Sequence, residues 1–467
     1  MSYPKPAPAV SPRLTLIATS LGLVLVILDV TVVNVALERI QLSLSTSVTG
    51  LQWVLNAYTL VFASLLLTAG SLGDRFGARR VFVTGLALFT AASLACGMAG
   101  GITALIAGRV VQGIGAALCV PASLALLNAS FPNAGARARA VSIWSGVGGL
   151  ALAAGPVVGG VMVARFGWPS IFLLNLPLGL LGLWMTLSYA PAGPKTPRRG
   201  LDIAGQVLAV LALSGISIGF VESGALGWSH PLVLLGFACF LVAAPAFLLM
   251  EARSTDPMLP LSMFRSPALS AACVVGFITN FAYYGLMFVL SLFFQATKNY
   301  SPLATGLAFL PMTALVTVTN LVAGWLTARH GPRLPMAMGQ LLAACGYWAL
   351  AGIGAGTPYG LIVGPLLAAG IGVALTVPAM TAAVLSHVDR HRTGIASGTL
   401  NAARQMGGVI GVGVFGSLVA GGEDKILSGM HTAMILAAIA LGIGALVSLF
   451  GVRAELPGKC ADAMNGG

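Results

Sequence analysis

Long apolar runs recur along the whole of this chain, and they limit it to one kind of fold. Each run has about 20 mostly apolar residues, which is the length one α-helix needs to cross the hydrocarbon core of a bilayer. The chain is 57% hydrophobic and only 8% charged, whereas soluble proteins carry roughly a quarter charged residues. A soluble core could not bury so much apolar surface. The sequence therefore predicts an all-α polytopic membrane protein.

Fourteen such runs can be distinguished. They lie near residues 14–36, 51–72, 80–99, 103–127, 140–163, 170–190, 202–221, 231–250, 268–296, 303–327, 334–355, 359–386, 396–420 and 430–452. The first run passes Asp29 and continues to about Ala36, which is too long for the apolar region of a typical signal peptide. It is therefore expected to remain as the first of fourteen membrane spans.

The Lys and Arg residues alternate with these spans. If both termini lie in the cytoplasm, the outer loops hold Arg39, Arg165, Lys298 and Lys425, and the spans themselves hold Arg109 and Arg404. All the other Lys and Arg residues of the 24 in the chain then fall on the cytoplasmic side. This positive-inside distribution supports the span count and predicts a bacterial inner-membrane protein with both termini cytoplasmic. It also explains the net charge of +12 without nucleic-acid binding, for which the chain has no basic domain.

Two parts of the chain resemble each other. The segment GIGAALCVPA at 113–122 matches GIGVALTVPA at 370–379, and GSLGDRFG at 70–77 matches GWLTARHG at 324–331, at nearly the same separation. Six helices thus repeat after a two-helix insert, and parallel halves of this kind enclose a substrate site near the membrane midplane. The expected parts are a cytoplasmic N-terminus at 1–13, a six-helix half at 14–190, an insert with cytoplasmic linkers at 191–267, a second six-helix half at 268–452 and a cytoplasmic tail at 453–467.

Charged residues at membrane depth are costly and mark candidate functional sites. Of the twelve acidic residues, only Asp29 is expected well inside a span, roughly 10 Å below its outer end at the rise of an α-helix. Arg109 is expected roughly 9 Å below the outer surface, so the two could meet. Burial disfavours an ionised carboxyl group and a nearby arginine favours it, so changing exposure could make Asp29 a proton carrier. The alternative is a static ion pair that fixes helix packing.

Other polar and flexible positions fall inside the spans. Arg404 could pair with a substrate anion or with backbone carbonyls at a helix break. Gly155, Pro156, Gly159 and Gly160 lie in the fifth span, where proline kinks a helix and glycines allow close approach, so they predict a gating hinge or a packing contact. The position equivalent to Asp29 in the second half is a tyrosine. The expected cavity residues are Asn34, Tyr58, Asn280, Tyr284, Gln295, Asn401, Arg404 and Gln405.

No metal site or cofactor is expected. His387 and His391 are four residues apart but stand beside Arg390 and Arg392, which makes a poor cation site, and the cysteines form no C-x-x-C pair. The chain also lacks a G-x-x-x-x-G-K-[ST] loop for ATP. Transport energy is therefore expected from the proton gradient, and the partners are protons, a small-molecule substrate and the lipid bilayer.

Several segments together resemble one group of transporters. They are Leu28–Leu37 (LDVTVVNVAL), Gly70–Arg80 (GSLGDRFGARR), Arg109–Ala117 (RVVQGIGAA), Gly155–Gly160 (GPVVGG), Ile171–Pro177 (IFLLNLP) and Asn401–Gln405 (NAARQ). With these motifs the chain resembles the fourteen-span drug:proton antiporters of the major facilitator superfamily, and within them the methylenomycin-resistance type of exporter. The resemblance covers nearly the whole chain.

The resemblance implies two six-helix halves with two inserted helices, and roles for particular residues. Arg109 would take part in proton coupling, and Asp29 would bind a proton or a cationic substrate. Asp74, Arg75 and Arg79 would form a cytoplasmic latch between helices. Ala328 replaces the acid of the corresponding motif in the second half, so that half would lack the carboxylate of its latch.

The function expected from these observations is a proton-coupled antiporter, active as a monomer, that exports a small amphipathic drug or antibiotic by alternating access. Export of an endogenous metabolite by the same machinery is the alternative. A membrane enzyme is not expected, because the loops are short and lack convergent acids or histidines.

Overall fold

The computed structural model describes residues 11–191, 202–254, 257–386, 393–420 and 423–452. Within these residues the chain is almost entirely helical, and none of them forms a β-strand. The helices are α1 (Pro12–Leu44), α2 (Val48–Phe76), α3 (Ala78–Gly97), α4 (Ile102–Ser130), α5 (Ala134–Phe166), α6 (Ser170–Leu173), α7 (Asn175–Tyr189), α8 (Ile203–Leu226), α9 (Pro231–Arg253), η1 (Leu261–Arg265), α10 (Pro267–Leu292), η2 (Phe293–Thr297), α11 (Pro302–His330), α12 (Arg333–Leu350), α13 (Tyr359–Ser386), α14 (Thr393–Val419) and α15 (Glu423–Gly451).

Thirteen segments of the described chain are long and apolar enough to cross a membrane. The short α6 and the longer α7 form one of them, and α10 with η2 forms another. The fourteenth expected span, 334–355, is α12, which has 18 residues. It includes Arg333 and a buried Gln340 and is therefore less apolar than the others. The all-α polytopic fold is confirmed, and the helix count is close to the one expected.

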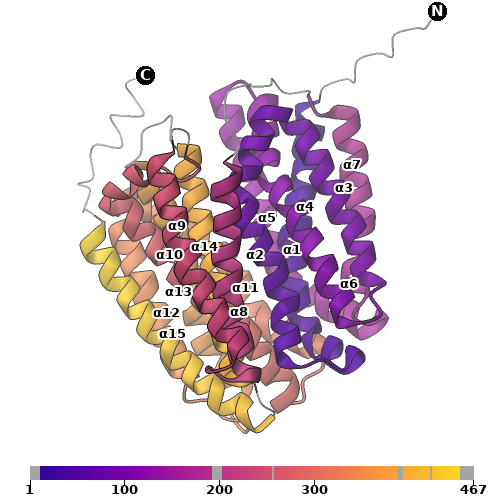
Figure 1. Cartoon of the computed structure of the whole chain (residues 1–467), viewed down its shortest axis with the longest axis vertical. Coiled ribbons are helices and arrows are strands. Elements are labelled where there is room, and N and C mark those ends of the chain that lie inside the picture. The colour runs from indigo at the N-terminus through magenta and orange to yellow at the C-terminus, as the bar shows by residue number, and fades with distance from the viewer. Residues whose placement is uncertain (1–10, 192–201, 255–256, 387–392, 421–422, 453–467) are drawn as a thin grey trace, which may run out of the picture.

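Two bundles of helices stand side by side, one built from α1–α7 and the other from α10–α15 (Figure 1). The same contacts recur in both: α1 packs on α5 as α10 packs on α14, α3 on α4 as α12 on α13, and α3 on α7 as α12 on α15. Between the bundles, α2 packs on α14 and α5 on α11. These two pairs are equivalent under the repeat, as a twofold relation between the halves requires.

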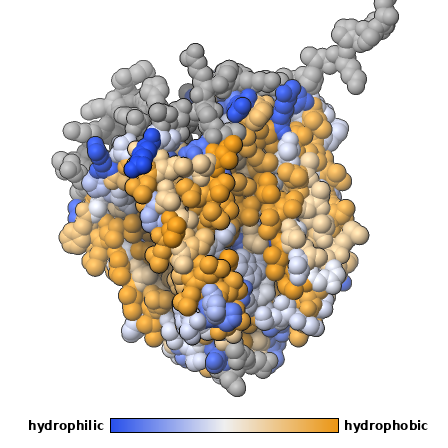
Figure 2. Space-filling model, in the orientation of Figure 1, coloured by the Kyte–Doolittle hydropathy of each residue, from blue (hydrophilic) through white to orange (hydrophobic). Residues whose placement is uncertain are grey.

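The inserted helices lie at one of these junctions. Helix α8 contacts both α2 and α14, and α9 packs on α8. Side chains of α9 such as Leu241 and Val242 are about 70% exposed, at 68% and 72%, as expected for a helix that faces lipid. Figure 2 shows the wider pattern, in which hydrophobic residues form a broad belt and strongly hydrophilic ones lie toward the two ends.

The two ends of the molecule are packed differently. We call the end at which α1 begins the proximal end and the opposite one the distal end. One large apolar cluster joins both halves toward the distal end and includes Leu37 of α1, Leu51 of α2, Phe294 of η2 and Phe415 of α14. Toward the proximal end each half has a cluster of its own. The distal end is therefore closed by contacts between the halves.

Candidate functional site

An ion pair is buried between α1 and α4. Arg109 Nη1 donates to Asp29 Oδ2, and the two side chains are 1% and 0% exposed. The residues expected at similar depth from the sequence are thus in contact. A buried pair of this kind holds its geometry strongly, because removal of either partner leaves an uncompensated charge in a medium of low polarity.

Polar side chains from three further positions complete the surroundings of Asp29. Its Oδ1 accepts hydrogen bonds from Gln112 Nε2 at 3.2 Å and from Asn175 Nδ2 at 3.1 Å. Ser93 Oγ accepts from both amides, at 2.7 Å from Gln112 and 3.3 Å from Asn175. Gln112 lies three residues after Arg109 and hence on the same helix face, where its Oε1 accepts from Arg109 Nη1 at 2.9 Å.

Asn175 reaches this site because the sixth span is broken. Helix α6 ends at Leu173 and α7 begins at Asn175. Pro177 follows in the first turn of α7, and a proline ring clashes with the carbonyl four residues earlier and has no N–H to donate. The break places the Asn175 side chain, which is 1% exposed, against Asp29. Gln112 and Asn175 lie within the motifs quoted above and Ser93 lies outside them. Their convergence on one carboxylate is a result of tertiary packing.

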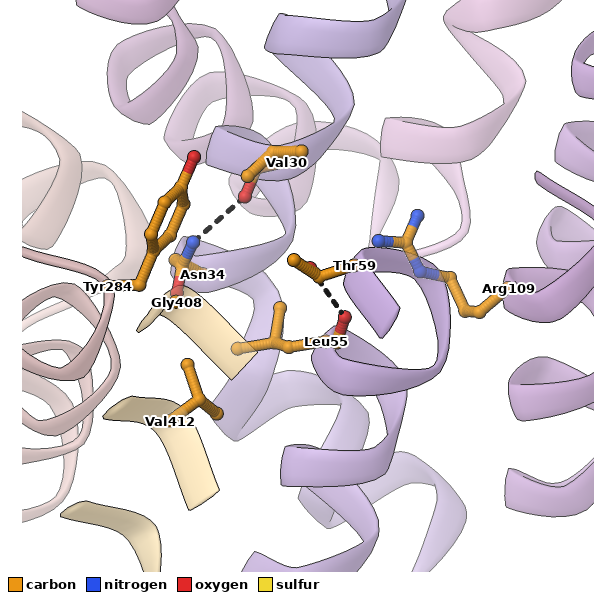
Figure 3. A pocket seen from close by; sticks show the side chains of 8 residues that line it. All are labelled: Val30, Asn34, Leu55, Thr59, Arg109, Tyr284, Gly408 and Val412. Atoms are coloured by element: carbon orange, nitrogen blue, oxygen red, sulfur yellow. Dashed lines mark hydrogen bonds between the residues drawn. The ribbon is translucent and has the colours of Figure 1, made fainter. Parts of the chain in front are cut away.

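Arg109 also faces the space between the two halves. A small cavity there is lined by Val30 and Asn34 of α1, Leu55 and Thr59 of α2, Arg109 of α4, Tyr284 of α10, and Gly408 and Val412 of α14. Figure 3 shows Arg109 on one side of it and Tyr284 on the other. Asp29 does not line the cavity, so Arg109 stands between the cavity and the carboxyl group.

Two further contacts fix the arginine in this position. Its Nε donates to the carbonyl oxygen of Val54 at 2.9 Å. Its guanidinium carbon lies 4.3 Å from the centre of the Tyr58 ring, which is the geometry of a cation–π contact. Tyr58, expected to line the cavity, therefore supports Arg109.

The structure divides the other expected cavity residues into three groups. Asn34 and Tyr284 line the cavity. Gln295 is 1% exposed and donates to Ser291 in the distal packing, where the Ser291 hydroxyl in turn donates to the Asn34 carbonyl. Asn280 is buried in α10 and is not among the lining residues.

The third group consists of Asn401, Arg404 and Gln405, which lie on α14 proximal to the cavity. Arg404 is half-buried, and its Nη1 is 3.4 Å from Asn401 Oδ1. Its Nε is shielded from solvent and has no hydrogen-bond partner. The structure does not show the contact with backbone carbonyls that was one of the two expectations for this arginine.

The glycine–proline stretch of α5 is packed tightly against both halves. A Cβ added at Gly155 would lie 1.8 Å from Thr31 Oγ1, and one at Gly159 would lie 3.0 Å from the backbone of Val32, both on α1. On the other face, a Cβ at Gly160 would lie 2.8 Å from the Pro302 carbonyl oxygen of α11. Pro156 packs on Gly306 of α11, and a Cβ added at Gly306 would lie 2.2 Å from the carbonyl oxygen of Pro156. The stretch is therefore a close-packed junction between α1, α5 and α11.

The expected latch residues lie at the proximal end. Asp74 and Arg75 are exposed, and Arg75 stacks on the ring of Phe76. Arg79 donates to the carbonyl oxygen of Leu187 at the end of α7. In this closed-distal arrangement the structure places Arg79 against its own half.

Two carboxyl groups lie near the ends of the inserted helices, just past the expected spans 202–221 and 231–250, namely Glu222 in α8 and Glu251 in α9. Glu222 accepts a hydrogen bond from Trp53 Nε1 at 2.7 Å, and Glu251, 2% exposed, accepts from the Leu259 amide at 3.1 Å. Helices α8 and α9 thus extend to Leu226 and Arg253, past the expected span ends at 221 and 250.

Among the described residues no group of three or more His, Cys, Asp and Glu side chains is placed to hold a metal ion. His387 and His391 lie outside the described residues, as do the predicted N-terminal segment up to residue 10, the linker at 192–201 and the tail at 453–467.

Comparison with known proteins gives consistent matches over most of the chain. The sequence profile of the Major Facilitator Superfamily matches residues 19–412. The methylenomycin A resistance protein of Streptomyces coelicolor is 40% identical over 412 residues, which are 88% of this chain and 86% of that protein. The tetracenomycin C resistance and export protein of Streptomyces glaucescens is 37% identical over 412 residues, covering 87% and 76%.

Solved structures share the fold at low identity. A bacterial homologue of the human lysosomal transporter Spinster has a TM-score of 0.68 at 17% identity, over 94% of this chain and 96% of that one. A transporter of the POT family has a TM-score of 0.70 at 14% identity, over 93% and 95%.

Proposed function

The chain belongs to the Major Facilitator Superfamily and is a multi-pass membrane transporter rather than an enzyme, and from this premise we propose that it exports a small amphipathic drug or antibiotic in exchange for protons. Relatives named as resistance and export proteins, at 37–40% identity over most of the chain, support a drug substrate. The proton as the coupling ion is supported by the buried pair of Asp29 and Arg109.

The observation that carries the proposal is the position of Arg109. It contacts the carboxyl group of Asp29 on one side and lines the cavity between the halves on the other. Protonation of Asp29 removes the negative partner of Arg109, so the arginine becomes free to interact with groups in the cavity. Conversely, a substrate that fills the cavity keeps Arg109 against Asp29, which favours the ionised carboxyl group and therefore proton release. Arg109 is thus the link between the two sites.

We propose that residues 14–190 and 268–452 move as the two units of alternating access. The packing between the halves at the distal end would open in one state, and the separate proximal clusters would come together. Asp74, Arg75 and Arg79 would then form their latch in that second state. The junction of α5 with α1 and α11 is where the halves would hinge.

The basic residues indicate which end faces the cytoplasm. The proximal end carries Arg75, Arg79, Arg80, Arg137, Arg139, Arg253, Arg265, Arg329 and Arg333, while the distal end carries Arg39, Arg165, Lys298 and Lys425. By the positive-inside rule the proximal end is cytoplasmic, in the inner membrane of a bacterium. The structure then corresponds to a state closed to the outside. We propose that the protein is active as a monomer, because one chain contains both six-helix halves.

The proton gradient is large enough for this work. One elementary charge crossing a potential of about 100 mV releases about 2.3 kcal/mol, and each pH unit adds about 1.4 kcal/mol. With a difference of one pH unit, exchange of one proton per cycle would therefore supply about 3.7 kcal/mol and sustain a substrate gradient of roughly several hundredfold.

A drug panel on cells that express or lack the protein tests the proposal, with a protonophore as control. We expect expression to raise resistance to some members of the panel and the protonophore to remove that protection. Sensitivity unchanged across the whole panel would favour the alternative, export of an endogenous metabolite by the same machinery.

A further inference from the structure

Arg404 of α14 is a positive charge at the proximal margin of the cavity that the proton-coupling site does not use. Its guanidinium group is 3.4 Å from the neutral amide oxygen of Asn401, and its Nε has no hydrogen-bond partner. A desolvated donor without an acceptor is unfavourable. Such a group at the edge of a substrate cavity is suited to accept a ligand that supplies the missing acceptor.

The packing of α10 against α14 holds this arginine in place. A Cβ added at Gly276 of α10 would lie 2.9 Å from Arg404 Cγ, so only glycine leaves room for the aliphatic part of the side chain. One turn farther along α14, Gly408 gives the same room to the ring of Tyr284, whose Cδ2 would be 2.8 Å from an added Cβ. The two glycines therefore seat Arg404 and Tyr284 on neighbouring turns of the same interface.

Tyr284 connects Arg404 to the cavity. It is a lining residue of the cavity, opposite Arg109 in Figure 3, and it packs on Gly408, one turn of α14 after Arg404. A ligand in contact with Tyr284 is thus within reach of a guanidinium group. Arginine offers a planar set of N–H donors that matches the two oxygens of a carboxylate.

The charges around the cavity also favour an anionic ligand. Asp29 and Arg109 neutralise each other in their ion pair. Among the described residues around the cavity, Arg404 then remains without a counter-charge, and it is positive. On this basis, which rests on the proposed export function, we propose that Arg404 and Tyr284 form an anion subsite, and that the exported substrate is an amphipathic molecule bearing a carboxylate or a similar anionic group.

Binding of three small aromatic probes to the purified full-length protein tests this proposal. Naphthoate, naphthamide and naphthylmethylammonium share one ring system and differ in charge. We expect naphthoate to bind the wild-type protein roughly tenfold to a hundredfold more tightly than naphthamide, the range for a hydrogen-bonded charge, and naphthylmethylammonium to bind least.

Arg404→Gln should reduce naphthoate affinity to that of naphthamide and leave naphthamide binding unchanged. Arg329→Gln is the matched control, since Arg329 is exposed at the proximal end of α11 and stacks on Trp325, and it should preserve the preference. If Arg404→Gln does not fold, Arg404→Lys serves instead: it removes the planar fork and should weaken naphthoate binding several-fold. Naphthoate binding that is unchanged in the Arg404 variant, or wild-type protein that binds none of the probes or does not prefer naphthoate, would overturn the subsite.

This assay needs neither a gradient nor transport, so it separates the two proposals. A charge preference that depends on Arg404, in a protein that shows no proton-driven efflux of any compound, would contradict the proposed function and support the subsite. Proton-driven efflux with no such preference would support the function and contradict the subsite.

Discussion

Replacement of Asp29 by asparagine removes the ionisable group with little change in shape. The carboxyl group accepts hydrogen bonds from Arg109, Gln112 and Asn175. An amide offers one acceptor oxygen and turns two N–H groups toward these donors, so at least one contact is lost and Arg109 loses its counter-charge. Removal of one partner of a buried ion pair costs about 3–5 kcal/mol.

The lower end of that range is expected here. Arg109 keeps the Val54 carbonyl, the Gln112 amide oxygen and the Tyr58 ring as partners. A loss of about 3 kcal/mol lies within the stability of most folded domains, so the variant should fold in the membrane. Asp29→Asn should abolish gradient-driven transport, because an amide does not take up or release a proton at physiological pH.

The assay has two parts. Substrate is added to purified protein in weak buffer with a pH indicator, and efflux from proteoliposomes is followed after a pH jump. Wild-type protein should release protons on substrate binding and show gradient-driven transport. Asp29→Asn should do neither, while it still exchanges labelled for unlabelled substrate at equal concentrations.

Glu222→Gln is the matched control, because it removes another carboxyl group of a membrane-spanning helix, one that contacts Trp53 outside the cavity. It should retain both proton release and driven efflux. If Asp29→Asn released protons and transported substrate as the wild-type protein does, Asp29 would have no part in coupling.

Three further predictions concern the halves and their orientation. Gly159→Leu should abolish efflux, since even a Cβ there lies 3.0 Å from the α1 backbone, whereas Gly146→Leu on the same helix should be tolerated because open space surrounds it; efflux and thermal stability measure both. Gln52→Ala removes two hydrogen bonds from α2 to α14 carbonyls, worth about 1 kcal/mol each. It should increase labelling, by an impermeant thiol reagent added outside, of a cysteine introduced at Val412, a lining residue of the cavity; unchanged labelling would argue against a role of Gln52 in distal closure. In a variant without native cysteines, Asn299→Cys should react with an impermeant reagent in intact cells and Arg80→Cys only after lysis; the reverse pattern would invert the proposed topology.

Most of the fold follows from the sequence because one physical constraint dominates it. A helix in lipid must be long and apolar, and this requirement is visible in each run of residues. This apolar pattern is weakest in α12, where the amide nitrogen of the buried Gln340 donates to Thr279 and Thr376 of neighbouring helices. The requirement for apolar residues constrains helix ends less, and so α8 and α9 extend past the expected spans 202–221 and 231–250 and include Glu222 and Glu251.

The site was only partly predictable from the sequence, because the contacts of each side chain depend on the direction in which it points. The sequence predicts similar depths in the membrane for Asp29 and Arg109, because the rise per residue of an α-helix is fixed. Depth does not reveal which way a side chain points. Gln295 was expected in the cavity but packs in the distal closure, and Asn175 reaches Asp29 only because the sixth span breaks.

The central claim is that movement of the substrate is driven by protons exchanged at Asp29. Its most direct test is accumulation of substrate by purified protein in proteoliposomes, with and without an imposed pH difference or membrane potential. We predict accumulation against a gradient only when protons are available to flow in the opposite direction. Equal accumulation in vesicles without any pH or voltage difference would contradict the account.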